Sequence, residues 1–210
     1  SIAFHDPMNQ WASLQMELVL RMETPNGKPR ISKVNINKEE GTFEVSYVSK
    51  GHLLTYRVDQ FDSAQVYADF QLATNRKTTD SLDLTSARAR RWRDYYTYLY
   101  GLPMKIKDEG TILGEQVNNE YFNGQAVLAL KVNYSPEVGK DSWYFYFHPE
   151  TYALVGYRFY HDEAINDGEY IVLDEMEIQR GMRIPKNRYW YVNEDGRFLG
   201  ADMMLSLRVN

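Results

Sequence analysis

The second half of the chain constrains the fold most, because it consists of one predicted β-strand after another. Between residues 142 and 209 the strand-like segments are SWYFYFHP, YALVGYRFYH, EYIVLDEMEI, RIPKNRYWYV and RFLGADMMLSL. In the first of them Trp143, Phe145 and Phe147 fall on one face, and Tyr144 and Tyr146 fall on the other. A sheet with one face in water alternates between apolar and polar residues. A sheet made of these strands must therefore cover or enclose its second face, or hold an apolar ligand there.

The first half of the chain also shows the period of two that is typical of strands. Apolar and polar residues alternate over 11–23, which predicts a long half-buried strand. The further predicted strands in this half are 30–37, 42–49, 52–59 and 64–70. Residues 71–86 are polar and have no period, so we expect a loop there. Asn123-Gly124, between 112–122 and 125–134, is the strongest short signal for a hairpin turn.

One helix is predicted, over about 87–102. Thr85 or Ser86 can cap its start, and Gly101 and Pro103 follow in the order expected at a helix end. Arginines at positions 88, 90, 91 and 93 lie in its first turns, where positive charge opposes the helix dipole. We therefore expect acidic side chains near that end. The arginines could alternatively recognise a phosphate or an anionic head group.

The order of these elements predicts a mainly β (α+β) fold. The strands follow one another without intervening helices, which favours antiparallel pairing. About eleven strands are too many for a flat sheet of this size. We expect a single curved antiparallel sheet that forms an incomplete β-barrel, with the helix packed in its concave face. Since no linker or repeat is visible, we expect one domain over 1–210.

Composition excludes several classes of protein. The net charge of −5 argues against nucleic-acid binding, and the lack of cysteine excludes disulfides, thiolate metal sites and cysteine nucleophiles. No apolar run approaches the roughly 18 residues of a transmembrane segment. The chain opens with Ser-Ile-Ala rather than Met, so we expect a processed or trimmed form, either after removal of a signal peptide or by a cloning choice.

No standard catalytic motif is present, and the four histidines lack metal-ligand spacing. The best local candidate for a site is the segment 160–169, which has one imidazole and four carboxylates within nine residues. Its His161 could act as a base with Asp162 or Glu163, and Asp162, Glu163 and Asp167 could hold Ca²⁺. The simpler interpretation is a solvated hairpin loop, because the spacing does not match an EF-hand. We expect no cofactor, no metal and no catalytic residue.

Several segments together resemble a known family. Asp141-Ser-Trp-Tyr-Phe-Tyr-Phe-His-Pro-Glu-Thr-Tyr-Ala-Leu, followed by two strands and Gly181-Met-Arg-Ile-Pro-Lys, resembles the end of LolA-like proteins, which include periplasmic lipoprotein carriers. Ile2-Ala-Phe-His-Asp-Pro, Tyr95-Tyr-Thr-Tyr-Leu-Tyr-Gly-Leu-Pro-Met-Lys and Tyr160-His-Asp-Glu are more similar to an uncharacterised family of envelope (lipo)proteins of Gram-negative bacteria. This second resemblance covers nearly the whole chain.

The resemblance implies an incomplete barrel whose cavity holds acyl chains, in the periplasm or at the outer membrane. We expect a non-catalytic, monomeric binding protein for a lipid, a lipoprotein acyl chain or another hydrophobic ligand, with a peripheral or lipid-anchored membrane association. The alternatives are a structural or protein-interaction module with a self-filled cavity, and an enzyme that uses His161 and Asp162. The expected cavity wall comprises Trp92, Tyr96, Leu99 and Tyr100 of the helix and Trp143, Phe145 and Phe147 of the sheet.

Overall fold

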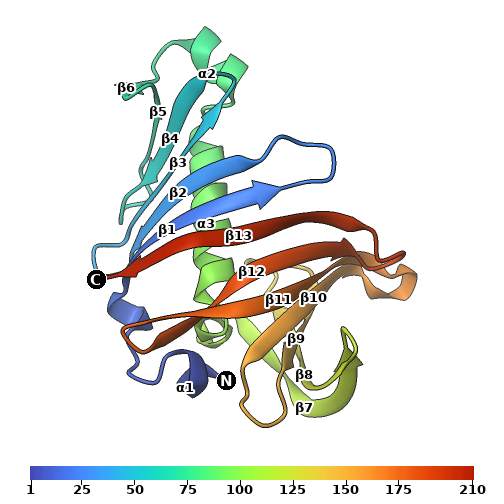
Figure 1. Cartoon of the computed structure of the whole chain (residues 1–210). Coiled ribbons are helices and arrows are strands. Elements are labelled where there is room, and N and C mark those ends of the chain that lie inside the picture. Colours follow the sequence, from blue (N-terminus) through green and yellow to red (C-terminus); the bar gives the residue numbers. More distant parts are fainter. The chain divides into compact units, whose positions relative to one another are not determined.

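The computed structural model describes all of residues 1–210 and contains thirteen strands in one open sheet (Figure 1). The hydrogen-bonded order is β6-β5-β4-β3-β2-β1-β13-β12-β11-β10-β9-β8-β7. Hairpin neighbours pair antiparallel, as in β1 with β2 and β11 with β12. The predicted fold class, a mainly β protein with an antiparallel sheet that is not closed and one long helix, is confirmed.

The chain divides into two compact units, which are described separately. Unit 1 comprises 1–8, 24–27 and 102–202, and unit 2 comprises 9–23, 28–101 and 203–210. The strand β13 (Phe198–Val209) contributes residues to both. The expectation of one domain over 1–210 stays a prediction.

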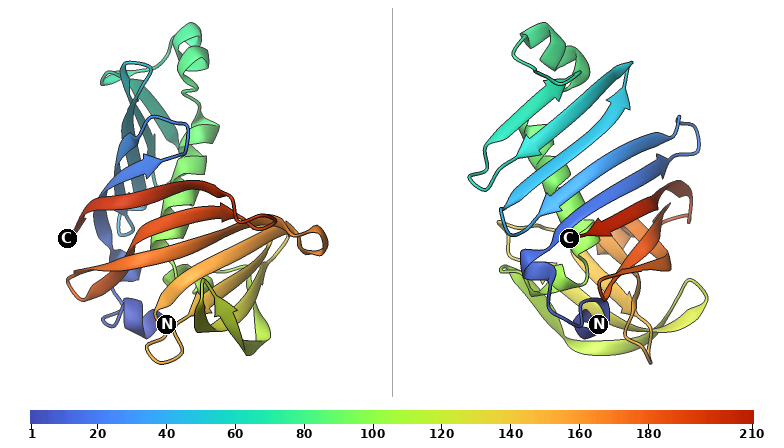
Figure 2. Two further views of the ribbon diagram at one scale, coloured as in Figure 1. Left: turned by 45° about the vertical axis from the view of Figure 1, so that its right-hand side comes forward. Right: turned by 60° about the vertical axis from the view of Figure 1, so that its left-hand side comes forward.

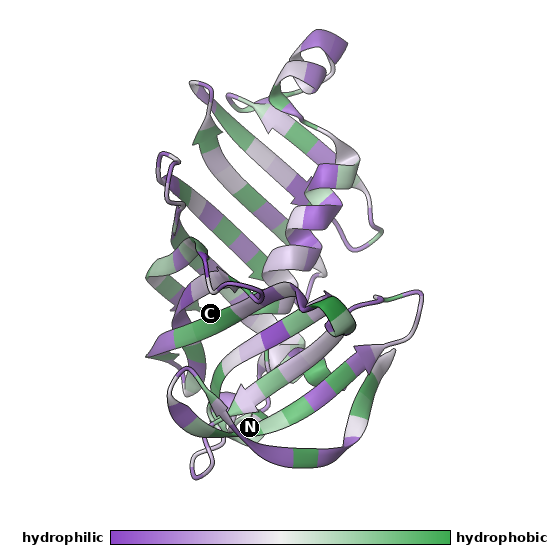
Figure 3. Ribbon diagram, turned by 90° about the vertical axis from the view of Figure 1, so that its right-hand side faces the viewer, coloured by the Kyte–Doolittle hydropathy of each residue, from purple (hydrophilic) through white to green (hydrophobic).

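Unit 2 contains strands that carry one apolar face and one helix that covers it. Its elements are η1 (Trp11–Ser13), β1 (Gln15–Glu23), β2 (Arg30–Asn37), β3 (Thr42–Ser49), β4 (His52–Val58), β5 (Ala64–Ala68), β6 (Gln71–Leu72), α2 (Arg76–Leu82) and α3 (Ser86–Gly101). Helix α3 packs on β3, β4 and β5, and Figure 2 shows it beside them. Phe43 of β3 stacks on Tyr96 of α3 at 6.4 Å between ring centroids. The alternating residues of β1, such as Leu18, are buried on the same side, which is the period-two pattern of the sequence (Figure 3).

The start of α3 agrees with its sequence signals. The Thr85 Oγ1 accepts a hydrogen bond from the Arg88 backbone N at 3.1 Å, so Thr85 is the cap. The Asp62 carboxylate accepts hydrogen bonds from Arg90 Nε at 2.7 Å and from Arg93 Nη1 at 2.6 Å. Asp83 pairs with Arg88. The prediction that acidic side chains offset the arginines is confirmed.

Two local predictions in unit 2 are wrong. Residues 71–86 are not a loop throughout, because β6 and α2 lie there. The helix α2 has no buried residue, so the sequence shows no apolar period there. The Asn75 side chain caps this helix by accepting a hydrogen bond from Thr78 N at 3.3 Å. The first strand begins at Gln15, since residues 11–13 form a 3₁₀ turn.

Unit 1 contains the aromatic strands. Its elements are α1 (Ile2–His5), η2 (Met104–Lys107), β7 (Thr111–Phe122), β8 (Gln125–Tyr134), β9 (Ser142–Phe147), β10 (Leu154–Asp162), η3 (Glu163–Ile165), β11 (Asp167–Gln179) and β12 (Met182–Val192). Asn123 and Gly124 both have positive φ, 48° and 78°, as the predicted hairpin turn between β7 and β8 requires. Both faces of this sheet carry rings. Trp143 contacts Phe159 on one face at 4.9 Å, and Phe122 stacks on Tyr146 on the other at 4.2 Å.

Candidate functional site

An apolar pocket of about 470 Å³ lies in unit 1, on one face of strands β7, β8 and β9. Val117 of β7, Leu128 and Leu130 of β8, and Phe147 of β9 form its floor. They share a face because the strands are in register: Val117 is opposite Leu130, and Leu128 is opposite Phe147. Side chains alternate along a strand, so the residues between them point to the other side of the sheet. The floor is therefore a direct result of the period-two sequence.

Two short segments from distant parts of the chain form the walls of the pocket. Ile2 and Ala3 come from α1, while Pro103 and Ile106 come from the segment that includes η2. None of these four side chains carries a hydrogen-bonding group, so the pocket presents an almost wholly apolar surface. No local sequence pattern predicts these walls, because segments about 100 residues apart meet only in the folded protein.

The helix α1 is held in place by a buried histidine. Arg183 O and the His5 Nδ1 are 2.6 Å apart, and Leu154 N donates to the His5 Nε2 at 2.9 Å. Since a carbonyl only accepts and this backbone N–H donates to Nε2, the ring is neutral with its proton on Nδ1. Burial, assisted by the positive charges of the N-terminus and Arg183, lowers the pKa of His5 from 6.5 to about 4. Arg183 Nη1 also donates to Phe4 O at 2.7 Å.

The polar part of the pocket is small. Ser1, Lys107 and Tyr152 complete its lining. Lys107 is exposed and takes part in none of the ion pairs of the structure, whereas Lys105 pairs with Asp108. An apolar pocket with a free ammonium group at its rim has the chemistry to bind an amphiphile with an apolar tail and a negative head.

One of the seven residues expected to form the cavity wall lies in this pocket, namely Phe147. Trp143 and Phe145 share its face and stack on each other at 6.0 Å between ring centroids. Phe145 is fully buried. The roles of Trp143 and Phe145 as ligand contacts stay predictions.

The four helix residues expected in the cavity wall lie in unit 2. The rings of Trp92 and Tyr96 stack with 5.5 Å between their centroids, and the centroids of the Tyr96 and Tyr100 rings are 6.3 Å apart. The Tyr96 hydroxyl accepts from Arg30 Nη2 at 3.2 Å, while Leu99 is buried. The rings thus form one contiguous column along α3, and their contact with a ligand stays a prediction.

The polar segment 160–169 comprises the end of β10, η3 and the start of β11, and several of its polar side chains have partners within the chain. His161 Nδ1 lies 2.8 Å from the Asp141 Oδ1, which raises the pKa of His161. Asp162 accepts from Ala164 N, and Glu163 binds Lys131 at 2.8 Å. The structure thus pairs His161 with Asp141, not with either carboxylate suggested by the sequence. Sequence analysis did not identify Asp141, because the two residues meet only through the pairing of β9 and β10.

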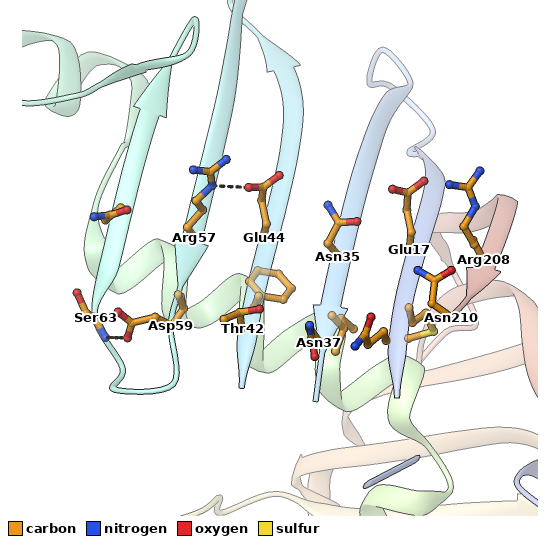
Figure 4. Close-up of a pocket in the computed structure, with 16 residues that line it drawn as sticks. Glu17, Asn35, Asn37, Thr42, Glu44, Arg57, Asp59, Ser63, Arg208 and Asn210 are labelled. Carbon is orange, nitrogen blue, oxygen red and sulfur yellow. Dashed lines mark hydrogen bonds and ion pairs between the residues drawn. The ribbon is translucent and has the colours of Figure 1, made fainter. Parts of the chain in front are cut away.

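A second pocket of about 470 Å³ lies in unit 2, and its lining combines polar side chains with apolar ones such as Phe43 and Val58 (Figure 4). Gln65, Arg57, Glu44, Asn35 and Glu17 form one row across five strands, since each is opposite the next. Arg57 pairs with Glu44, as the dashed line in Figure 4 shows. Glu17 pairs in turn with Lys33 of β2, so the charges of this row are offset by cross-strand pairs, as is common on the solvated face of an amphipathic sheet. We therefore regard the apolar pocket as the candidate site.

None of the helices combines the length and the apolar character needed to cross a membrane.

Two solved structures are similar to the whole chain. A LolA superfamily protein from Nitrosomonas europaea has a TM-score of 0.56 at 7% identity, covering 99% of this chain and 90% of that chain. A putative outer membrane lipoprotein-sorting protein domain from Vibrio parahaemolyticus has a TM-score of 0.55 at 10% identity, covering 96% and 87%. These likenesses show a LolA-like fold. No protein of curated function matches the sequence. A family model described as a family of unknown function, DUF6503, matches residues 1–206, and the chain therefore belongs to that family.

Proposed function

We propose that the protein is a non-catalytic binding protein of the bacterial envelope, which holds the acyl chain of a lipid, a lipoprotein or a similar amphiphile in the apolar pocket. The observation that carries the proposal is the pocket itself. Its volume of about 470 Å³ is within the range of small-molecule sites. The LolA-like fold supports an envelope location and a lipid ligand.

The energy available from the pocket is sufficient for binding. Each buried methylene contributes about 0.8 kcal/mol, so a chain of about eight methylenes gives a gross gain of ~6 kcal/mol before ordering costs. The floor residues Leu128 and Leu130 and the wall residue Ile106 offer such a chain apolar contacts on two sides. An anionic head group would then lie near Lys107.

The experiment uses displacement of a fluorescent fatty acid. We expect the wild-type protein to bind the probe, and Leu130→Gln to weaken it about tenfold by placing an amide in the floor. The matched control is Leu205→Gln, which makes the same change at an exposed leucine of β13 outside the pocket. Absence of binding to the wild-type protein, or equal weakening by both variants, contradicts the proposal and favours a module whose cavity is filled by its own side chains.

A second comparison tests the role of Lys107. Palmitic acid and hexadecanol share a tail and differ in charge. An exposed ion pair is worth about 0.2–1 kcal/mol, so Lys107→Gln should weaken the acid by about 1.4- to fivefold and leave the alcohol unchanged. Lys77→Gln, on the exposed face of α2, removes the same charge away from the pocket. If Lys107→Gln affects acid and alcohol equally, the head group does not bind there.

A further inference from the structure

The face of the unit 1 sheet opposite the pocket carries an ordered row of rings and cations. Lys131 of β8 is opposite Tyr144 of β9, and Tyr144 is opposite Arg158 of β10. Arg158 is in turn opposite Tyr170 of β11, which is opposite Tyr191 of β12. These five residues, here called the aromatic row, cross five neighbouring strands. All five are half-buried, so the row is partly open to solvent.

Three neighbouring pairs of the aromatic row are in contact through the faces of tyrosine rings. The Lys131 ammonium lies 5.1 Å from the centre of the Tyr144 ring, and the Arg158 guanidinium lies 5.2 Å from that of Tyr170. Tyr170 and Tyr191 stack at 5.0 Å with an angle of 13° between their planes. Phe198, exposed at the start of β13, extends the row at 5.5 Å from Tyr191. Mutual packing holds the rings in fixed orientations, which lowers the entropy cost of binding a partner.

The two cations of the aromatic row differ in their partners. Lys131 pairs with Glu163 at 2.8 Å, and the Tyr144 hydroxyl donates to the same carboxylate at 2.5 Å. Arg158 takes part in no ion pair. Its Nη1 donates to the Tyr160 hydroxyl at 3.1 Å, while its Nε is buried without a hydrogen-bond partner. A guanidinium has five donors in a planar fork that matches a carboxylate. Arg158 therefore has no carboxylate partner, and its half-buried guanidinium carries an uncompensated positive charge among the rings.

We propose that the aromatic row binds an acidic polypeptide segment of a partner protein, with a carboxylate on Arg158 and the neighbouring apolar side chains over Tyr170 and Tyr191. A carboxylate is expected because its charge is complementary to that of Arg158. A polypeptide is expected because tyrosine and arginine are enriched at the hot spots of protein–protein interfaces. Four strand spacings of about 4.8 Å give the row a width of ~19 Å, which matches about six extended residues.

The proposal is tested by fluorescence anisotropy with two labelled seven-residue peptides. One carries two aspartates between leucines, and the other carries asparagines in their place. We expect the wild-type protein to bind the aspartate peptide at least tenfold more tightly. Arg158→Gln should abolish this difference. The control Lys186→Gln removes one positive charge from the exposed Lys186–Glu175 pair elsewhere in unit 1 and should retain it.

Two further variants keep the test decisive if Arg158→Gln fails to fold. Arg158→Lys keeps the charge but not the fork, so the preference for aspartate should fall between those of the wild type and Arg158→Gln. Tyr191→Leu removes the stacked ring and should weaken both peptides. Near-ultraviolet circular dichroism checks the fold of each variant. The fatty-acid probe, which reports on the opposite face, should bind all of them equally, so this proposal and the proposed function fail independently.

Three outcomes overturn the proposal. The wild-type protein could bind both peptides equally, or Arg158→Gln could keep the preference for aspartate. In the third outcome, oligogalacturonate, which carries carboxylates on sugar rings, binds to the row while the aspartate peptide does not. The surface would then be a glycan site, and the assignment of a polypeptide partner would be wrong.

Discussion

Lowering the pH from 7 to 4 is expected to destabilise the protein through one buried histidine, His5. Its neutral ring links α1 to the backbone of Arg183 and Leu154, and a second proton on Nε2 would abolish the bond from Leu154 N. The pKa of His5 in the folded protein is about 4, below the ordinary 6.5. Between these values the unfolded chain binds the proton and the folded chain does not. Stability is therefore fully present above about 6.5 and is lost as the pH falls towards 4.

The size of this effect follows from the two pKa values. The interval from 6.5 to about 4, at ~1.4 kcal/mol for each pH unit, gives a loss of about 3 kcal/mol. This is a large fraction of the ~5–15 kcal/mol by which ordinary domains are stable. Since α1 contributes Ile2 and Ala3 to the apolar pocket, the same change should loosen one wall of the site.

The assay is urea unfolding at pH 7, 5.5 and 4, followed by tryptophan fluorescence, for the wild type and His5→Gln. Carboxylates also titrate in this range, so the relevant quantity is the difference in free energy of unfolding between the two proteins. That difference should favour the wild type at pH 7 and shrink by about 3 kcal/mol at pH 4. A difference that does not change with pH would show that protonation of His5 does not destabilise the folded protein.

The matched control is His161→Gln. Asp141 raises the pKa of the exposed His161, so its contribution has the opposite sign: it is present at low pH and is lost as the pH rises through the folded pKa. Removing His161 should therefore leave the acid-induced loss of stability in place. A flattening of the pH dependence by this variant would show that the histidine at position 5 is not its cause.

Two further predictions concern stability and use the same unfolding assay. A Cβ at Gly156 would lie 2.3 Å from the Phe122 ring and 2.7 Å from a backbone oxygen, so Gly156→Ala should cost about 1–3 kcal/mol, whereas Gly139→Ala, with its nearest neighbour at 3.9 Å, should be nearly neutral. Equal effects of the two would contradict the close packing on this face. Thr85→Ala should lower the free energy of unfolding by about 1 kcal/mol, because it removes the cap of α3. The control Thr74→Ala, at an exposed position, should leave it unchanged. A Thr85→Ala protein as stable as the wild type would show that the cap is dispensable.

For the candidate site, the sequence predicts the strands that form the pocket floor but not the segments that form its walls. The floor residues Leu128, Leu130 and Phe147 lie on strands whose period is visible in the sequence, and Phe147 was expected in the cavity wall. The walls were not predicted, because Ile2 and Ile106 reach the pocket through long-range packing. The partner of His161 was missed for the same reason: pairing of β9 and β10 brings it to Asp141.

The amino-acid sequence alone determined most of the strands, the helix α3 and its ends, the hairpin at Asn123-Gly124 and the presence of rings on both faces of the second-half sheet. These features depend on local backbone preference and on side-chain alternation, which are properties of neighbouring residues. The face that forms a pocket, the segments that form its walls and the cation that lacks an ion pair among the tyrosines are known only from the folded protein. Those outcomes depend on strand register and on contacts between residues far apart in the chain, where a shift of one residue exchanges the two faces.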